Sequence, residues 1–226
     1  MSSTHTFAKI SVILLAGGIG SRMQSIKPKQ FLQLADKPIA RFSFDVFLAM
    51  PEIDEIVVVC LPEYRDLFEC PANKRLTFAL PGERRQDSVY NGLMNTSNEG
   101  NIICIHDGAR PFIDEELVRR ALEAGIAHGA ATVGMPVKFT VKQSDKHHFV
   151  HSTPDRSFIW EIQTPQVIRK DLLQAGFDYA NENNLTVTDD VSLVELLGKE
   201  VKLVEGSHVN LKITVPADLV IAASFL

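Results

Sequence analysis

A glycine-rich loop that directly follows an apolar run is the feature that most constrains this chain. The apolar residues 10–15 (ISVILL) run straight into AGGIG at residues 16–20, and the cations Arg22, Lys27 and Lys29 follow shortly afterwards. A buried strand that ends in such a loop leaves backbone N–H groups unpaired in one concavity, which suits phosphate oxygens. The nearby cations can neutralise the charge of a polyphosphate. The segment therefore predicts a polyphosphate site at the end of the first strand.

Two familiar phosphate loops do not fit this segment. The P-loop string G-x-x-x-x-G-K-[S/T] does not occur, and a dinucleotide loop would need a third glycine where Met23 stands. Pro28 also follows too early for a helix to have started at Gly20, so an oxidoreductase is disfavoured. The string LLAGGIGSRM followed by PKQ is instead similar to the signature of nucleotidyltransferases that load a sugar or polyol phosphate onto a nucleoside triphosphate.

Composition narrows the function classes. The 226 residues suit a single α/β domain spanning residues 1–226, and the net charge of −5 argues against a role on nucleic acid or on a membrane surface. A bilayer span would need about 20 apolar residues in a row, and the sequence has no such run. Cys60, Cys70 and Cys104 have no CxxC spacing and predict reduced, mostly buried thiols. Together with the short stretch before the first strand, they predict a cytoplasmic protein.

Strand and helix patterns alternate along the chain. Strands are expected at residues 10–15, 55–61, 77–80, 101–106 and 131–136, and helices at residues 38–50, 84–93 and 114–127. This alternation predicts βαβ units and a mostly parallel sheet, whose ligands should lie at the carboxyl ends of the strands. The glycine loop and the pair His106-Asp107 both fall on that edge.

The pattern changes after residue 136. Strands at residues 138–142 and 148–152 around a turn at 143–147 predict a hairpin, and extended structure resumes at 162–167. The segment has too few apolar positions for a core of its own, so we expect a projecting arm that a partner covers. Its histidines, His147, His148 and His151, fit a solvated hairpin tip better than a metal clip. Helices are expected at residues 170–180, 190–197 and 216–225, with Thr188-Asp189 as the N-cap of the second.

Several short motifs carry charged and polar residues, and each has an ordinary structural explanation. Asp107 and Arg110 of HDGARP could form a local ion pair of little value, and Asp87 or Ser88 of GERRQDSV could simply cap a helix. Their order along nearly the whole chain is more specific: AGGxGxRM, PKQ, GExRxxSV, HDGARP, PVxxTxK, DRSxxWxxQTPQ, TDD and NxKxT. In this order the chain closely resembles the 2-C-methyl-D-erythritol 4-phosphate cytidylyltransferase family.

The resemblance implies a fold, a reaction and partners. The fold is a Rossmann-like nucleotidyltransferase α/β fold, a mostly parallel twisted sheet flanked by helices, with a β-arm at about residues 137–162 that dimerises the protein. The reaction joins CTP and methylerythritol phosphate to give the CDP-linked alcohol and pyrophosphate. The implied cofactor is a divalent cation, normally Mg²⁺, held mainly on the CTP phosphates, so no protein residue is assigned as a metal ligand.

The resemblance also assigns residues. It places CTP against Ala16, Gly17, Gly18, Gly20, Gly82, Glu83 and Ser88. It places methylerythritol phosphate against Asp107, Arg110, Thr140, Arg156, Thr188 and Lys212. The catalytic set is Arg22 and Lys29, which would stabilise the reacting phosphate, and Arg156 and Lys212, which would aim the nucleophile. The chain departs from the family at Phe139, where an aspartate usually precedes the arm threonine.

The expected chemistry explains these residue types. A phosphomonoester is largely dianionic at neutral pH, because its second pKa is about 6, so the nucleophile needs no general base. Repulsion between two anionic substrates must be overcome by in-line positioning and fixed positive charge.

Two other functions fit parts of the pattern. A ribitol 5-phosphate cytidylyltransferase would share the loop, PKQ and HDxxRP, and would differ mainly in the polyol pocket. A catalytically dead nucleotide-binding protein is disfavoured, because it would not need both sets of cations.

Overall fold

A seven-stranded sheet forms the centre of the computed structural model, which describes residues 8–18, 23, 27–97 and 101–226. The strand order is β11-β7-β10-β6-β1-β4-β5. The strands are β1 (Ile10–Leu15), β4 (Ile53–Val59), β5 (Arg75–Ala79), β6 (Ile102–Asp107), β7 (Ala130–Pro136), β10 (Trp160–Arg169) and β11 (Lys202–Glu205). Only β10 runs antiparallel to its neighbours in this sheet, β6 and β7, which confirms the predicted mostly parallel α/β fold.

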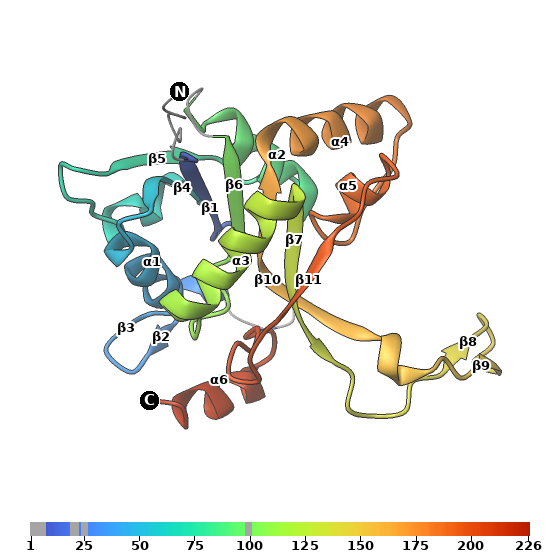
Figure 1. Cartoon of the computed structure of the whole chain (residues 1–226). Helices are drawn as coiled ribbons and strands as arrows, with labels where there is room; N and C mark the ends of the chain where they lie inside the picture. Colours follow the sequence, from blue (N-terminus) through green and yellow to red (C-terminus); the bar gives the residue numbers. More distant parts are fainter. Residues whose placement is uncertain (1–7, 19–22, 24–26, 98–100) are drawn as a thin grey trace.

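Helices cover both faces of the sheet (Figure 1). They are α1 (Ile39–Ala49), α2 (Arg85–Met94), α3 (Glu115–His128), α4 (Lys170–Glu182), α5 (Ser192–Glu195) and α6 (Pro216–Ala223), with 3-10 turns at Lys29–Phe31, Pro62–Leu67 and Arg156–Phe158. Two short strands, β2 (Gln33–Leu34) and β3 (Lys37–Pro38), pair beside α1. No helix among these described elements is long and apolar enough to cross a membrane.

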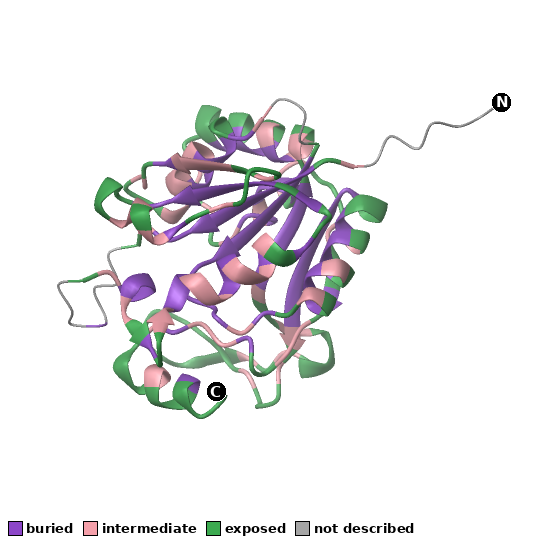
Figure 2. Ribbon diagram, turned by 90° about the vertical axis from the view of Figure 1, so that its left-hand side faces the viewer, coloured by how far each residue is buried: buried purple, intermediate pink, exposed green. Residues whose placement is uncertain are grey.

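The central strands are apolar on both sides because both sides are covered. Val12 and Leu14 of β1 face the cluster that includes Phe44 of α1 and Leu117 of α3. Ile13 of β1 faces the opposite cluster, which receives α2, α4 and α5. Figure 2 shows the buried strands between the outer helices. An unbroken apolar run such as ISVILL is typical of strands in this position.

The parallel register brings several strand ends to one level. Leu15, the last residue of β1, pairs with Val59 at the end of β4 and with Asp107 at the end of β6. Val59 in turn pairs with Ala79 at the end of β5. The loops that follow these strands therefore open at the same edge, as the sequence predicted.

The segment after β7 projects from the body of the protein (Figure 1). Its hairpin is formed by β8 (Gln143–Ser144) and β9 (Val150–Ser152), so the predicted strand at residues 138–142 was wrong and the turn lies later in the chain. The Asp145 carboxylate sets this turn, because it accepts the backbone N–H groups of His147 and Phe149. Apolar rings at Phe139 and Phe158 are each 81% exposed on this arm.

Other predicted elements differ at their ends. The helix expected at residues 190–197 is only the single turn α5. At its start, the Asp189 Oδ1 accepts the Ser192 N–H at 3.2 Å. Strand β11 was not predicted, because it lies at the sheet edge and only Val204 of its residues is buried.

The three cysteines are free thiols, and burial raises the pKa of Cys60 to about 11 and that of Cys104 to about 12.

The packing of α3 on β10 makes a stability prediction at Gly125. A Cβ at this position would overlap the Val167 side chain and approach its carbonyl oxygen. Gly125→Ala should therefore lower the free energy of unfolding by about 1–3 kcal/mol, although alanine is the better helix former by about 1 kcal/mol. Denaturant unfolding measures the change, with the exposed Glu123→Ala on the same helix as control, expected within about 0.5 kcal/mol of wild type. An increase in stability for Gly125→Ala would contradict the close approach.

Candidate active site

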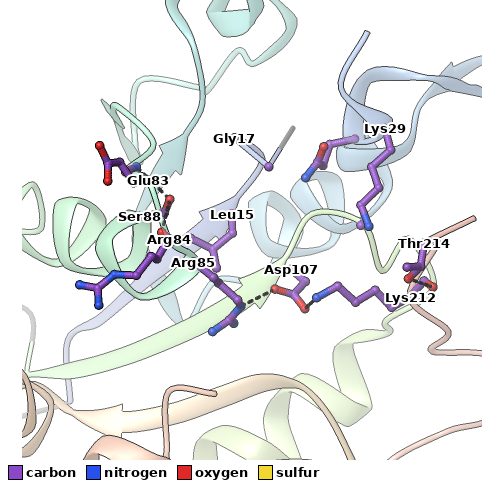
Figure 3. A pocket seen from close by; sticks show the side chains of 14 residues that line it. Leu15, Gly17, Lys29, Glu83, Arg84, Arg85, Ser88, Asp107, Lys212 and Thr214 are labelled. Atoms are coloured by element: carbon purple, nitrogen blue, oxygen red, sulfur yellow. Dashed lines mark hydrogen bonds and ion pairs between the residues drawn. The ribbon is translucent and has the colours of Figure 1, made fainter. Parts of the chain in front are cut away.

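Two adjoining cavities lie at the carboxyl edge of the sheet. The first, of about 430 Å³, is lined by the glycine loop, Lys29, the segment before α2, and Thr214. The second, of about 290 Å³, is lined by residues that include Arg110, Gln163 and Thr188. Three residues line both cavities: Arg85, Asp107 and Lys212. Figure 3 shows these three side chains directed toward one another, with Asp107 between Arg85 and Lys212.

The glycine loop forms one wall of the first cavity. The Ala16 N–H donates to the carbonyl of Val59 at 2.9 Å, which holds the loop start against the neighbouring strand. A Cβ on Gly17 would overlap the Pro81 ring, so this close approach requires glycine. Gly18 is exposed at the cavity, whereas Gly20 and Arg22 lie outside the described residues.

The segment before α2 forms a second wall, next to the glycine loop. The Gly82 N–H donates to Ser88 Oγ at 3.0 Å, and the Arg84 N–H donates to Asp87 Oδ2 at 3.0 Å. Asp87 therefore caps α2, as its position allowed, while Ser88 holds the turn at Gly82. Glu83 also lines the cavity. Helix capping thus shapes the wall that the resemblance assigns to CTP.

Lys29 reaches the first cavity from a third element. It begins the 3-10 turn Lys29–Phe31, and its side chain is largely buried. Phe31 anchors this turn in the core, where its ring stacks on that of Tyr64 with centroids 3.9 Å apart. The predicted cation is therefore placed in the cavity by an aromatic anchor two residues along the chain.

A buried carboxylate joins the two cavities. Asp107 ends β6 and is only 7% exposed. Its Oδ2 lies 2.7 Å from the Lys212 Nζ, and its Oδ1 accepts from the Arg85 Nε at 3.2 Å. The Arg110 Nε lies farther away, 3.9 Å from Oδ2, so the local ion pair expected between these neighbours is the weakest of the three.

These contacts set the charge of the cluster. Burial opposes the ionisation of Asp107, but the positive charges of Arg85 and Lys212 outweigh it and hold the pKa of this carboxyl well below its usual range. Burial alone would lower the pKa of Arg85, yet its two carboxylate partners, Asp190 and Asp107, raise that pKa above its ordinary value. The Asp107 carboxylate is therefore ionised and the Arg85 guanidinium is charged at neutral pH.

Arg85 is the functional residue that the sequence reasoning missed. Its guanidinium makes a two-pronged contact with the buried Asp190 carboxylate, at 2.7 and 2.8 Å, while its Nε contacts Asp107. The signal was present, since Arg85 is the arginine of the GExRxxSV motif, but no role was given to it. Asp190 is held in turn by Gln166, whose Oε1 accepts the Asp190 N–H at 2.8 Å.

Lys212 is positioned by the irregular segment before α6. The Ile213 N–H donates to the Ala109 carbonyl at 2.8 Å, and the Asn210 side chain donates to the Thr164 carbonyl at 2.9 Å. The Arg110 guanidinium completes the attachment by donating to the Asn210 carbonyl at 2.7 Å. The NxKxT motif therefore places a lysine opposite Asp107.

Three of the predicted site residues that are described line neither cavity. Ala16, predicted to bind CTP, is fully buried and its N–H is already bonded to Val59. Thr140 and Arg156 are exposed on the arm and line neither cavity, and the Arg156 guanidinium donates to the Lys138 carbonyl at 2.8 Å. Phe139 is exposed beside Thr140. Within one chain, the structure therefore brings together Lys29, Asp107 and Lys212 but not the arm residues.

No protein cage for a metal is evident in the part of the chain that is described. No group of three or more His, Cys, Asp or Glu side chains there could hold an ion. Asp107 already has two cationic partners, so it is a poor ligand for a further cation.

Known proteins share both the sequence and the fold. The IspD family model, described as 2-C-methyl-D-erythritol 4-phosphate cytidylyltransferase, matches residues 10–226. A relative of that name from Oryza sativa subsp. japonica, called chloroplastic, is 48% identical over 216 residues, which cover 94% of this chain and 73% of the relative. Another from Caldanaerobacter subterraneus subsp. tengcongensis is 41% identical over 223 residues, covering 96% and 98%.

Solved structures agree. The crystal structure of 4-diphosphocytidyl-2C-methyl-D-erythritol synthase from Anaerococcus prevotii is similar with a TM-score of 0.86 at 28% identity, covering 96% of this chain and 98% of that one. That of the Francisella tularensis cytidylyltransferase has a TM-score of 0.83 at 31% identity, covering 97% and 100%. With its two cavities, its shared ion cluster and this likeness over nearly its whole length, the chain belongs to the 2-C-methyl-D-erythritol 4-phosphate cytidylyltransferase family.

Proposed function

We propose that this protein joins CTP and 2-C-methyl-D-erythritol 4-phosphate to give 4-CDP-2-C-methyl-D-erythritol and pyrophosphate, a step of non-mevalonate isoprenoid precursor biosynthesis. The observation that carries the proposal in the structure is the pair of adjoining cavities that share Arg85, Asp107 and Lys212. Two anionic substrates can meet there across fixed positive charge. Both relatives named above carry the methylerythritol name, which favours this polyol phosphate over ribitol 5-phosphate.

The first cavity suits the nucleoside triphosphate. Its glycine loop offers close backbone approach at Gly17 and Gly18, and the neighbouring wall presents Gly82, Glu83 and Ser88. Lys29 enters from the side, where a cation would lie beside the phosphates. Arg22, which lies outside the described residues, stays assigned to the same phosphates.

The second cavity suits the polyol phosphate. Arg110 and Lys212 supply cations, and Thr188 supplies a hydroxyl. An oxygen of the dianionic phosphomonoester would attack the α-phosphorus of CTP, and the bond to the β-phosphate would break as pyrophosphate leaves. No proton has to be removed from the nucleophile, since its second pKa is about 6. The chain therefore contributes position and charge rather than a general base.

A divalent cation fits this site as part of the CTP complex. Mg²⁺ prefers oxygen ligands and is commonly held by one or two carboxylates together with substrate phosphates. Among the described residues that line the first cavity, the carboxylates are Glu83 and Asp107, and Asp107 is already paired with two cations, so the phosphates would supply most of the ligands. When bound, the ion would neutralise charge on the triphosphate, while Lys29 and the glycine loop would hold that triphosphate in line.

We further propose a homodimer that forms through the arm. Phe139, Phe149 and Phe158 are each more than 70% exposed there, which is unusual for rings that no partner covers. Thr140 and Arg156 cannot be assigned to the cavities of their own chain, so they would serve those of a partner. The cytoplasm remains the proposed location, although the rice relative is named chloroplastic.

The reaction is tested by a product assay. CTP with 2-C-methyl-D-erythritol 4-phosphate and Mg²⁺ should yield pyrophosphate and the CDP-linked alcohol, measured by coupled pyrophosphate detection and mass spectrometry. Excess EDTA should abolish the activity, and excess Mg²⁺ should restore it. Faster turnover of ribitol 5-phosphate would contradict the assigned polyol, and activity that survives EDTA would contradict the role of the metal.

A subunit-mixing experiment tests whether each site is shared. Lys29→Ala and Arg156→Ala homodimers should each be nearly inactive. A heterodimer of the two would have one site with both defects and one with neither, so mixing should restore activity to at most about half of wild type. The control mixes Arg156→Ala with Thr140→Ala, which both lie on the arm and leave no intact site. If confirmed Lys29/Arg156 heterodimers stay inactive, each site is built from one chain.

A further inference from the structure

His106, the residue before Asp107 on β6, is fully buried and lines neither cavity. Its ring packs against Phe47 of α1 in a T-shaped arrangement, with centroids 5.5 Å apart. Its two nitrogens nevertheless reach two different parts of the site. Nε2 lies 3.0 Å from the Arg110 carbonyl oxygen, and Nδ1 lies 3.0 Å from Thr164 Oγ1.

Proton counting assigns the form of this ring. A carbonyl oxygen can only accept, so His106 Nε2 must carry the proton that bonds Arg110. The Thr164 hydroxyl oxygen already accepts the Asp107 N–H at 3.1 Å, which leaves its own proton free to bond His106 Nδ1. The His106 ring proton, the Thr164 hydroxyl proton and the Asp107 N–H then each meet an acceptor when the ring is neutral, with its proton on Nε2.

These bonds connect the two ends of the turn at residues 107–110. We call the set of hydrogen bonds that joins His106 to Arg110 and, through Thr164, to Asp107 the His106 bracket. The Arg110 N–H donates back to the Asp107 carbonyl at 2.9 Å, so the turn at residues 107–110 is tight. His106 holds the C-terminal end of this turn by its bond to the Arg110 carbonyl. It holds the N-terminal end through Thr164, which accepts the Asp107 N–H. Thr164 is available for this because β10 breaks register between Ile162 and Gln166.

We propose that His106 is a positioning residue for the polyol phosphate, and that it acts through the neutral Nε2-protonated bracket between Arg110 and Thr164. It takes no part in proton transfer. Asp107 and Arg110, the two ends of the bracketed turn, both line the second cavity. A shift of this turn would move the carboxylate that orients Lys212 and the guanidinium beside it. The consequence for kinetics rests on the proposed function, whereas the bracket itself does not.

The surroundings of His106 agree with a neutral ring. Burial lowers its pKa to about 4, and the nearby Arg110 and Lys212 add to that lowering, although the Arg110 carbonyl and Asp107 oppose it. A second proton, on Nδ1, would displace the Thr164 hydroxyl proton that now points at it. At neutral pH the bracket is therefore intact.

Nuclear magnetic resonance tests the bracket in the wild-type protein without any assay of activity. Long-range ¹H–¹⁵N spectra of ¹⁵N-labelled protein should show one of the seven histidines as neutral, with Nε2 protonated and Nδ1 not, and without titration between pH 5 and 8. Thr164→Val should shift the ¹⁵N signal of His106 Nδ1, because it removes the hydroxyl that bonds this nitrogen. A His106 ring that is an imidazolium at neutral pH, or a neutral His106 ring with its proton on Nδ1, would overturn the proposal.

Steady-state kinetics test what the bracket does. His106→Phe keeps a ring beside Phe47 but removes both nitrogens, and it should raise the KM for the polyol phosphate by about tenfold, the scale of one lost hydrogen bond, with little change in the KM for CTP. Thr164→Val serves as a second variant should His106→Phe not fold, and it should change the same KM.

Phe47→Leu is the matched control, because it removes the ring contact and leaves every hydrogen bond of the bracket in place. It should lower the melting temperature without changing either KM. If Phe47→Leu raises the KM for the polyol phosphate as much as His106→Phe does, His106 contributes only packing and the proposal is wrong. Equal changes in both KM values for His106→Phe would also overturn it.

Discussion

The contact on which the site depends is that between the buried Asp107 carboxylate and its cations. Burying a carboxylate without a partner costs free energy, and one exposed cation would offset little of that cost. Here Lys212 and Arg85 approach its two oxygens from opposite sides, at 2.7 and 3.2 Å. The carboxylate keeps two flexible cationic side chains in fixed places between the two cavities. It also balances part of their charge.

The fold supplies the partners of Asp107 from distant parts of the chain. The parallel register sets Asp107 level with Leu15, where the glycine loop begins. Arg85 is brought in at the start of α2, and Asp190, before α5, fixes its guanidinium from behind. Lys212 arrives on a segment that is bonded to the turn after Asp107. Strand register, helix start and loop attachment therefore converge on one carboxylate.

Sequence reasoning found the parts of this arrangement that depend on local pattern. The apolar run of β1, the helices α1 to α3 and the edge at which their loops meet follow from periodicity and burial on both faces. The first hairpin strand was misplaced because the side chain of Asp145 decides where the turn falls, and exposed arm residues carry little periodicity. Strand β11 is short and at an edge, so only one buried residue marks it.

The site residues show the same division. Lys29, Asp107 and Lys212 meet at the cavities as their motifs suggested, because each motif lies directly beside a strand end or an anchored turn. Arg85 was overlooked because its partner Asp190 is 105 positions away, and no local pattern relates them. The bracket of His106 is likewise made by Thr164, 58 positions away, in an interruption of the β10 ladder. Pairings of this kind become visible only in the folded chain.

The most direct test of this account is the steady-state kinetics of Asp107→Asn. The change keeps the shape of the side chain but removes the charge that orients Arg85 and Lys212, so kcat should fall by about 10²-fold or more and the KM for the polyol phosphate should rise. Asp114→Asn, at the N-cap of α3, removes the same charge at a site that serves only the helix and should leave both constants unchanged. Retention of wild-type kcat in Asp107→Asn, with any loss confined to the KM for CTP, would contradict the account.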